Sequence, residues 1–192
     1  YVENINPYLV GGPNVMISSR SKPICDVIPI RKGNQPTDGG NLIIEATDYD
    51  EFVRQEPKAQ KYIKKLIGAK EYINNLDRYC LWLKGVSPNM YRCIPLVIDR
   101  LNAVREFRKN SSTESVRKDA ENPSLFTQIR QTDSDYLALP KVSSERRRYI
   151  PMDYLSKDII PGDKLFMLPV TSVYYFGVLE SNVHMAWMRA VC

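Results

Sequence analysis

Short apolar segments of two periodicities follow one another irregularly in this chain, and this mixture is the strongest constraint on its fold. From Leu96 to Lys109, apolar side chains including Phe107 recur every three to four residues, as in an amphipathic helix whose other face holds Arg105 and Arg108. The segment 136–142 is instead a short apolar run, as in a buried strand. Because strands and helices do not alternate regularly, a doubly wound parallel sheet is disfavoured. We expect an α+β fold with mixed, mostly antiparallel, twisted sheets and flanking helices.

The rest of the chain supplies the other elements of this prediction. Carboxylates after Thr47 fit a helix start, Pro57 suits the first position of the next helix, and Gly68 suits its end. The predicted strands span 14–19, 41–45, 79–84, 136–142, 148–152 and 164–168. The predicted helices span 47–56, 57–68, 96–109 and 173–191, while 32–41 is a loop and 111–122 a polar helix or loop. The last helix carries an apolar stripe with Val183 and Trp187, which we expect to pack as core.

Composition narrows the class of protein. A length of 192 residues and a hydrophobic content of 43% support one domain with a proper core. The net charge of +5 is compatible with a polyanionic partner. Four cysteines without a C-x-x-C pair predict buried thiols in a reducing cytosol. A single histidine disfavours a zinc site of the usual ligand composition. No apolar run approaches the ~18 residues that span a bilayer, so we expect a cytoplasmic location and no membrane partner.

A run of three arginines is the main candidate for binding chemistry. Arg146, Arg147 and Arg148 follow Ser143, Ser144 and Glu145 and precede Tyr149. A guanidinium presents a planar fork of donors that fits phosphate oxygens or the O6/N7 edge of guanine. The alternative is a solvated charge run on a strand, in which Arg146 and Arg148 share one face and Arg147 lies on the other.

Catalytic chemistry is hard to assemble from these residues. The chain has no glycine-rich phosphate loop, and its one histidine, His184, fits a structural role in an apolar helix. A metal-dependent nuclease would have to use Asp99, Asp163 and Lys164 as its metal site, but the spacing of these residues does not indicate one. The segment 6–8 is similar to a methyltransferase Asn-Pro-Pro-Tyr loop but lacks the second proline, so a turn is the better interpretation. We predict neither a catalytic residue nor a metal site here.

Other basic and amide side chains fit nucleic acid. Arg20 and Lys22 lie near the N-terminus, and the helical arginines Arg105 and Arg108 add to the positive charge. The loop 33–41 carries amides that can address adenine, although a turn-rich connection explains it equally well.

An ordered set of motifs carries a family resemblance. It comprises Ile5-Asn6-Pro7-Tyr8-Leu9-Val10-Gly11-Gly12-Pro13-Asn14-Val15, Ser19-Arg20-Ser21-Lys22-Pro23, Gly39-Gly40-Asn41-Leu42, Tyr62-Ile63, Gly68-Ala69-Lys70-Glu71-Tyr72-Ile73, Tyr79-Cys80-Leu81-Trp82-Leu83, the run 143–151, Phe176-Gly177-Val178-Leu179 and His184-Met185-Ala186-Trp187-Met188. Over nearly its whole length, the chain resembles the target-recognition region of MmeI-like restriction–modification proteins. The resemblance implies a DNA target-recognition-domain type of fold and an excised piece of a longer adenine-N6 methyltransferase chain, with residues 1–192 as one domain.

The resemblance also implies the partners. This part would dock on double-stranded DNA beside the methyltransferase core of the same parent, while S-adenosylmethionine would bind in the missing catalytic domain and no cofactor here. The candidate DNA-contacting residues are Ser143, Ser144, Glu145, Arg146, Arg147, Arg148, Lys141, Thr171, Ser172, Tyr174, Arg20 and Lys22. Glu145 is expected to orient an arginine or to accept from a cytosine amino group. Two alternatives are a self-contained metal-dependent nuclease and a protein-interaction domain whose arginines meet acidic side chains.

Overall fold

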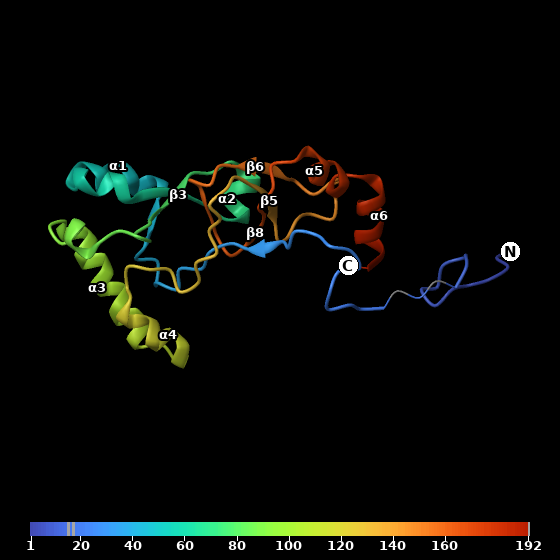
Figure 1. Ribbon diagram of the computed structural model, residues 1–192, viewed down its shortest axis with the longest axis horizontal. Helices are drawn as coiled ribbons and strands as arrows, with labels where there is room; N and C mark the ends of the chain where they lie inside the picture. The colour runs from blue at the N-terminus through green and yellow to red at the C-terminus, as the bar shows by residue number, and fades with distance from the viewer. Residues whose placement is uncertain (15, 17, 192) are drawn as a thin grey trace.

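Two four-stranded sheets form the body of the protein in a computed structural model that describes residues 1–14, 16 and 18–191 (Figure 1). Helices α1 and α3 cover one end of the molecule, and α5 and α6 cover the opposite end. The described residues among the first 30 have little regular structure, are mostly exposed, and leave the body on the side of α6. The α+β class and the mostly antiparallel pairing are confirmed.

The first sheet is entirely antiparallel and has the order β1-β8-β5-β6. Its strands are β1 (Arg31–Lys32), β8 (Leu165–Leu168), β5 (Tyr136–Pro140) and β6 (Asp153–Leu155). All five residues of β5 are buried, because both faces of this inner strand are covered. Leu137 and Leu139 pack under α5 (Val173–Leu179), whereas Tyr136 and Ala138 pack toward Tyr72 on the opposite face.

The second sheet has the order β2-β4-β3-β7 and contains the one parallel pair, β3 with β7. Its strands are β2 (Ile43–Glu45), β4 (Arg78–Leu81), β3 (Ile63–Ile67) and β7 (Ile160–Pro161). The main apolar core lies between this sheet and helix α3 (Pro95–Lys109), which buries Val97, Leu101 and Val104. The remaining helical elements are α1 (Ala46–Gln55), α2 (Ala69–Asn74), α4 (Glu114–Lys118), α6 (Asn182–Val191), and the 3-10 turns Pro57–Tyr62, Pro88–Met90 and Asp119–Glu121.

Several predicted elements are correct. Helices α1 and α3 and strands β2, β4, β5 and β8 lie where the sequence pattern put them, and Asn6–Tyr8 forms the expected turn. In that turn the Asn6 carboxamide oxygen accepts from the backbone N–H groups of Tyr8 and Val10. The polar stretch after α3 contains the short helix α4.

The predicted helix at 57–68 is wrong. Only one 3-10 turn follows Pro57, and the chain then extends as β3. The β-branched residue Ile63 and the partly buried Lys64 and Lys65 pair with β4, so tertiary pairing overrides the helical pattern. Gly68 begins α2 instead of ending a helix, and its N–H donates to the Glu71 carboxylate at 2.9 Å.

The predicted C-terminal helix is two helices. Helix α5 ends at Leu179, and α6 begins after Ser181, whose hydroxyl accepts from the His184 N–H at 3.1 Å. The break turns the predicted apolar stripe outward, so Val183 and Trp187 are 80% and 51% exposed and do not pack as core.

The predictions of strands at 14–19 and 148–152, and of buried thiols at Cys25 and Cys93, are also wrong. Met16 and Ser19 lie in exposed irregular backbone, while Val15 and Ile17 of the predicted 14–19 strand lie outside the described residues. The segment 148–152 contains bends, and the strand starts only at Asp153. Cys80 is buried, and burial raises the pKa of its thiol, but Cys25 and Cys93 are exposed and Cys192 lies outside the described residues.

Candidate nucleic-acid interface

The arginine run lies in the connection between β5 and β6, residues 141–152, which we call the arginine loop. A turn shapes its tip, where the Arg147 N–H donates to the Ser144 carbonyl at 3.0 Å. The Ser144 hydroxyl accepts from the Arg146 N–H at 3.3 Å, and the Ser143 hydroxyl accepts from the Arg147 guanidinium at 3.2 Å. The two serines therefore shape the loop itself, a role that short hydroxyl side chains often play in turns.

This turn replaces the strand alternation predicted for the three arginines. Arg146 and Arg148 are exposed, whereas Arg147 is half-buried and lines a small cleft with Tyr72 and Asp153. Arg147 still differs from its two neighbours in exposure, but a turn and not strand alternation produces this difference. Two guanidiniums thus point to solvent from the tip of one loop.

The arginine loop has a strong excess of positive charge. Within the described part of the chain, neither Glu145 nor any of the three arginines forms an ion pair, so the expected orientation of an arginine by Glu145 is not seen. The Arg148 guanidinium lies over the Tyr149 ring, 5.2 Å from its centroid. Three adjacent guanidiniums without carboxylate partners repel one another and favour an external anion.

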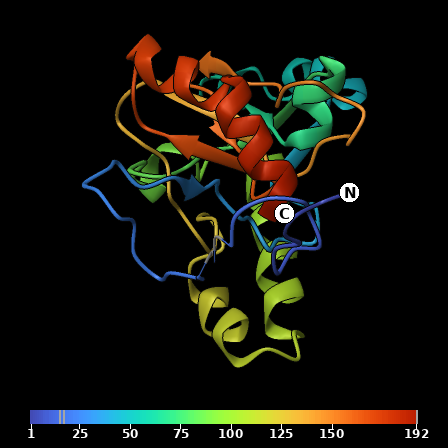
Figure 2. The same cartoon turned by 90° about the vertical axis from the view of Figure 1, so that its right-hand side faces the viewer.

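Helix α6 holds the base of the arginine loop. The Tyr149 hydroxyl donates to the Asn182 carboxamide oxygen at 2.9 Å, and the Arg189 guanidinium donates to the Arg148 carbonyl at 3.0 Å. Asn182 and Arg189 are seven residues apart, which puts them on one helix face. Sequence analysis missed both; their spacing of two helical turns, once α6 is separated from α5, is the signal that could have found them. Figure 2 shows α6 in front of the first sheet, where it meets this loop.

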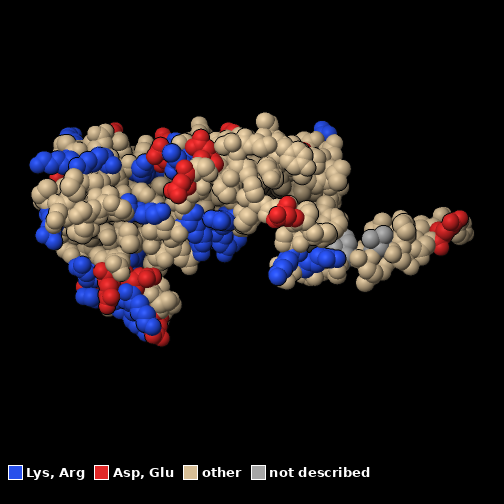
Figure 3. All heavy atoms as spheres, in the orientation of Figure 1, with Lys and Arg blue, Asp and Glu red and all other residues tan. Residues whose placement is uncertain are grey.

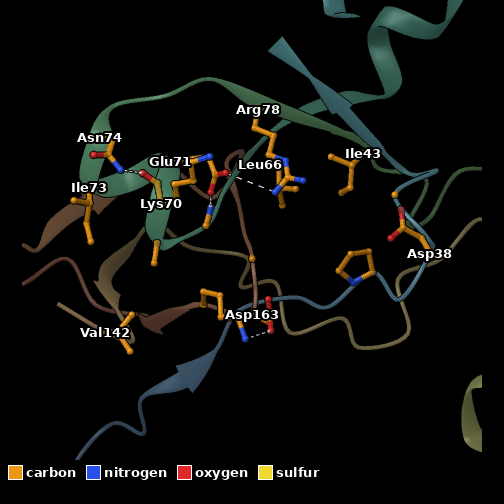
Figure 4. A pocket seen from close by; sticks show the side chains of 16 residues that line it. Asp38, Ile43, Leu66, Lys70, Glu71, Ile73, Asn74, Arg78, Val142 and Asp163 are labelled. Atoms are coloured by element: carbon orange, nitrogen blue, oxygen red, sulfur yellow. Dashed lines mark hydrogen bonds and ion pairs between the residues drawn. The ribbon is translucent and has the colours of Figure 1, made fainter. Parts of the chain in front are cut away.

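Lys141 opens the arginine loop beside a second cleft. Its N–H donates to the Lys164 carbonyl at 2.9 Å, so the two lysines lie directly across β5 and β8. The cleft has a volume of about 710 Å³ and is lined by Val142, Lys164, Lys70 and the first turn of α2 (Figure 4). The Glu71 and Arg78 side chains that line it are paired at 3.6 Å.

The other candidate residues lie apart from this loop. Thr171 and Ser172 follow the end of β8, which pairs with Leu137 and therefore lies at the opposite end of β5 from Lys141. Ser172 caps α5 through a 3.3 Å hydrogen bond to the Tyr174 N–H, and Tyr174 is exposed. Arg20 and Lys22 lie in the exposed N-terminal segment, outside the two sheets.

Two of the weaker predictions are wrong. Asn34 of the amide-rich loop is fully buried and donates to the Pro161 carbonyl at 3.1 Å, so it cannot address a base. Arg108, expected on the outer face of α3, is also fully buried and donates to five backbone carbonyls.

A catalytic centre does not assemble among the described residues. The Nδ1 atom of His184 lies 2.7 Å from the Leu179 carbonyl, which gives the imidazole a structural bond across the α5–α6 break. Asp99 and Asp163 line different clefts, so the set drafted for a nuclease is not grouped. Described residues contain no cluster of three potential metal ligands, and none of the described helices is long and apolar enough to cross a membrane.

Comparisons with known proteins agree on one family. The model of the MmeI target recognition domain matches residues 11–192. DNA methyltransferase A of Bacillus subtilis (strain 168) is 37% identical over 190 residues, which cover 99% of this chain and 22% of that protein. The solved structure of the type IIL restriction–modification enzyme MmeI in complex with DNA superposes with a TM-score of 0.90 at 39% identity, over 99% of this chain and 25% of that one. The chain thus spans about a quarter of the length of these relatives.

Proposed function

The chain belongs to the MmeI target recognition domain family, and from this premise we propose that it docks on duplex DNA and selects the sequence on which a longer protein acts. The observation that carries the proposal is the arginine loop, which projects two exposed guanidiniums from a rigidly held base. Arginine forks bind guanine edges or phosphates, and a loop anchored on a sheet holds them in place.

The longer protein supplies the chemistry in this proposal. Its methyltransferase core binds S-adenosylmethionine and transfers the methyl group to an adenine amino group in the cytoplasm. An adenine must leave the base stack to react, at a cost of a few kcal/mol. A separate recognition domain offsets part of this cost through phosphate and base contacts that hold the register of the duplex. The solved MmeI complex with DNA, at a TM-score of 0.90, supports this division.

Duplex binding by the chain itself tests the proposal. Fluorescence anisotropy with a labelled duplex should show binding at about 50 mM salt that weakens steeply at about 200 mM. Arg146→Ala and Arg148→Ala should each cost about 1–3 kcal/mol on preferred sequences. Arg92→Ala removes an exposed arginine that follows Tyr91 of the main core; it is the matched control and should bind like the parent.

The pattern of loss separates base reading from phosphate contact. After selection from a randomised duplex pool, loss of a base-reading arginine relaxes the choice at one position, whereas loss of a phosphate contact weakens all sequences equally. The absence of duplex binding at high micromolar protein and low salt would overturn the proposal for the isolated chain. If Arg92→Ala weakened duplex binding equally, the arginine loop would no longer be the DNA-binding element of this proposal.

A further inference from the structure

Three lysines lie on adjacent strands at one end of the first sheet. Lys32 ends β1 and pairs with Phe166 of β8, and Gly33 continues this register by donating to the Leu165 carbonyl at 2.8 Å. Lys164 precedes β8, and Lys141 lies across from it after β5. The strand order β1-β8-β5 therefore sets Lys32, Lys164 and Lys141, here called the lysine row, across the width of three strands.

Lys32 lies on the same side of the sheet as the apolar side chains that contact the arginine loop. Phe166 pairs with both Lys32 and Leu139, and Lys164 and Lys141 each lie two residues from one of these partners. Because side chains alternate along strands, Lys32, Phe166 and Leu139 lie on one side of the sheet. Ile150 and Met152 of the arginine loop pack on this same apolar face, with Leu139. Lys164 also borders the mouth of the larger cleft.

Little negative charge balances the lysine row. All three lysines are exposed, and within the described residues the one ion pair of the row joins Lys164 to Asp163 at 3.3 Å. Like charges directly opposite each other across two strands are destabilising, as for Lys141 and Lys164. In Figure 3, lysine and arginine side chains gather along the lower edge of the sheet region. The sheet end thus presents a positive edge whose repulsion a bound polyanion would relieve.

The dimensions fit a nucleic-acid backbone. Adjacent strands are about 4.8 Å apart, so the three strands span about 10 Å. One DNA strand carries a phosphate every ~3.4 Å of helix axis, so along that axis this width covers about three phosphates. Lysine is a flexible point charge suited to phosphates, whereas arginine offers the planar fork that base edges require.

We propose that Lys32, Lys141 and Lys164 bind consecutive phosphates of one DNA strand and so set the register in which the adjacent arginine loop meets the duplex. This inference rests on the proposed function, because it assigns the backbone contacts of the same interface. Lys141 connects the two sets directly, since it belongs to the lysine row and opens the arginine loop.

The salt dependence of duplex binding by the 192-residue chain tests the lysine row. Each phosphate contact contributes a slope of about −0.9 to the plot of log K against log salt concentration. The triple variant Lys32→Gln, Lys141→Gln, Lys164→Gln should therefore flatten the slope by about 2.7 and weaken binding equally for all sequences. The corresponding triple change to arginine should keep the slope, because the charges remain.

A matched control separates this site from a general effect of net charge. Lys58→Gln, Lys61→Gln, Lys84→Gln removes the same three charges from exposed positions around the main core and should leave the slope nearly unchanged. Equal flattening by both triples, or an unchanged slope in the lysine-row variant, would overturn the inference while duplex binding itself persists. If the parent chain shows no duplex binding, the proposed function fails and the lysine row fails with it.

Discussion

Arg108 is the most unusual single residue of the protein, because its charged side chain is fully buried and, within the described residues, has no carboxylate partner. Its guanidinium donates to the carbonyls of Pro36, Thr37, Asp119, Asn122 and Leu125 at 2.7 to 3.1 Å. Burial lowers the pKa of the guanidinium, with Asp119 and Asp38 acting against this effect. Five carbonyl dipoles take the place of a counter-ion and tie α3 to two distant loops.

Replacement of Arg108 should therefore lower the free energy of unfolding more than replacement of an exposed arginine would. Arg108→Ala leaves several buried carbonyls without donors, and Arg108→Lys cannot reach five acceptors, so each should lower the free energy of unfolding by about 3–5 kcal/mol. Urea denaturation followed by circular dichroism measures this loss. Arg105→Ala, on the half-exposed side of the same helix, should change the stability by less than about 0.5 kcal/mol. A loss below 1 kcal/mol in Arg108→Ala would show that water replaces the guanidinium.

Arg108 also shows why single residues are hard to assign from sequence. The helical pattern of α3 was correct, yet it placed Phe107 in the core and Arg108 outside, whereas Phe107 is 46% exposed and Arg108 is buried. Periodicity identifies the face of a helix, but the partner loops that satisfy a buried arginine come from residues 36–37 and 119–125, which no local pattern connects. The concentration of positive charge in the arginine loop was predictable, because the charge is contiguous in sequence. Its anchors on α6 were not, because they are more than 30 residues away.

Among the secondary-structure elements, α6 has the clearest functional consequence, since it fixes the arginine loop. The loop lacks strand pairing between Val142 and Met152, so the Tyr149–Asn182 and Arg189–Arg148 hydrogen bonds restrain its backbone. Restraint before binding reduces the entropy lost on binding. We therefore expect Asn182 of α6 to affect DNA affinity without contacting DNA itself.

A double-mutant cycle tests this role of α6. Tyr149→Phe and Asn182→Ala each remove one side of a single hydrogen bond, so each should weaken duplex binding by about 0.5–1.5 kcal/mol. The double variant should be no weaker than either single variant, because both lose the same interaction. The salt slope should stay that of the parent, since no charge is removed. Additive losses, or no loss, would indicate that the bond does not position the arginine loop.

The elements that the sequence predicted incorrectly share one physical reason. Segments 57–68 and 148–152 were assigned from local pattern, but each takes its structure from distant partners: β4 and β7 for the first, α6 and the apolar face of β5 for the second. Strand structure depends on neighbours in the sheet more than helix structure depends on its surroundings. The long, strongly periodic helix α3 was accordingly the safest prediction.

In the molecule as a whole, the two sheets are interleaved along the chain. Strands β1 and β2 belong to different sheets, and β7 of the second sheet lies between β6 and β8 of the first. The sheets meet at a tight crossing, where Asn34 N–H donates to the Pro161 carbonyl at 2.7 Å and Gly162 N–H donates to the Ile67 carbonyl at 2.9 Å. Neither sheet can be excised as a continuous piece of chain, which favours one folding unit.

Gly33 is the residue through which this coupling can be tested. A β-carbon at Gly33 would lie 2.6 Å from the Pro161 carbonyl oxygen and would also collide with that of Gly162, so alanine must push the two sheets apart. We expect Gly33→Ala to destabilise the protein by about 3 kcal/mol or more, since backbone atoms cannot yield as side chains do. Gly177→Ala is the control, because a β-carbon there meets nothing within 4 Å and alanine favours a helix by about 0.5–1 kcal/mol.

Hydrogen exchange reports on the two sheets separately. In the parent, the buried amides of β4 and β5 should exchange with the same free energy of opening, equal to that of global unfolding. Gly33→Ala should lower both values by the same amount, because loss of the crossing affects a single cooperative unit. If β5 lost protection while β4 kept it, the sheets would be independent. The position of the arginine loop relative to the core around α3 would then vary in solution.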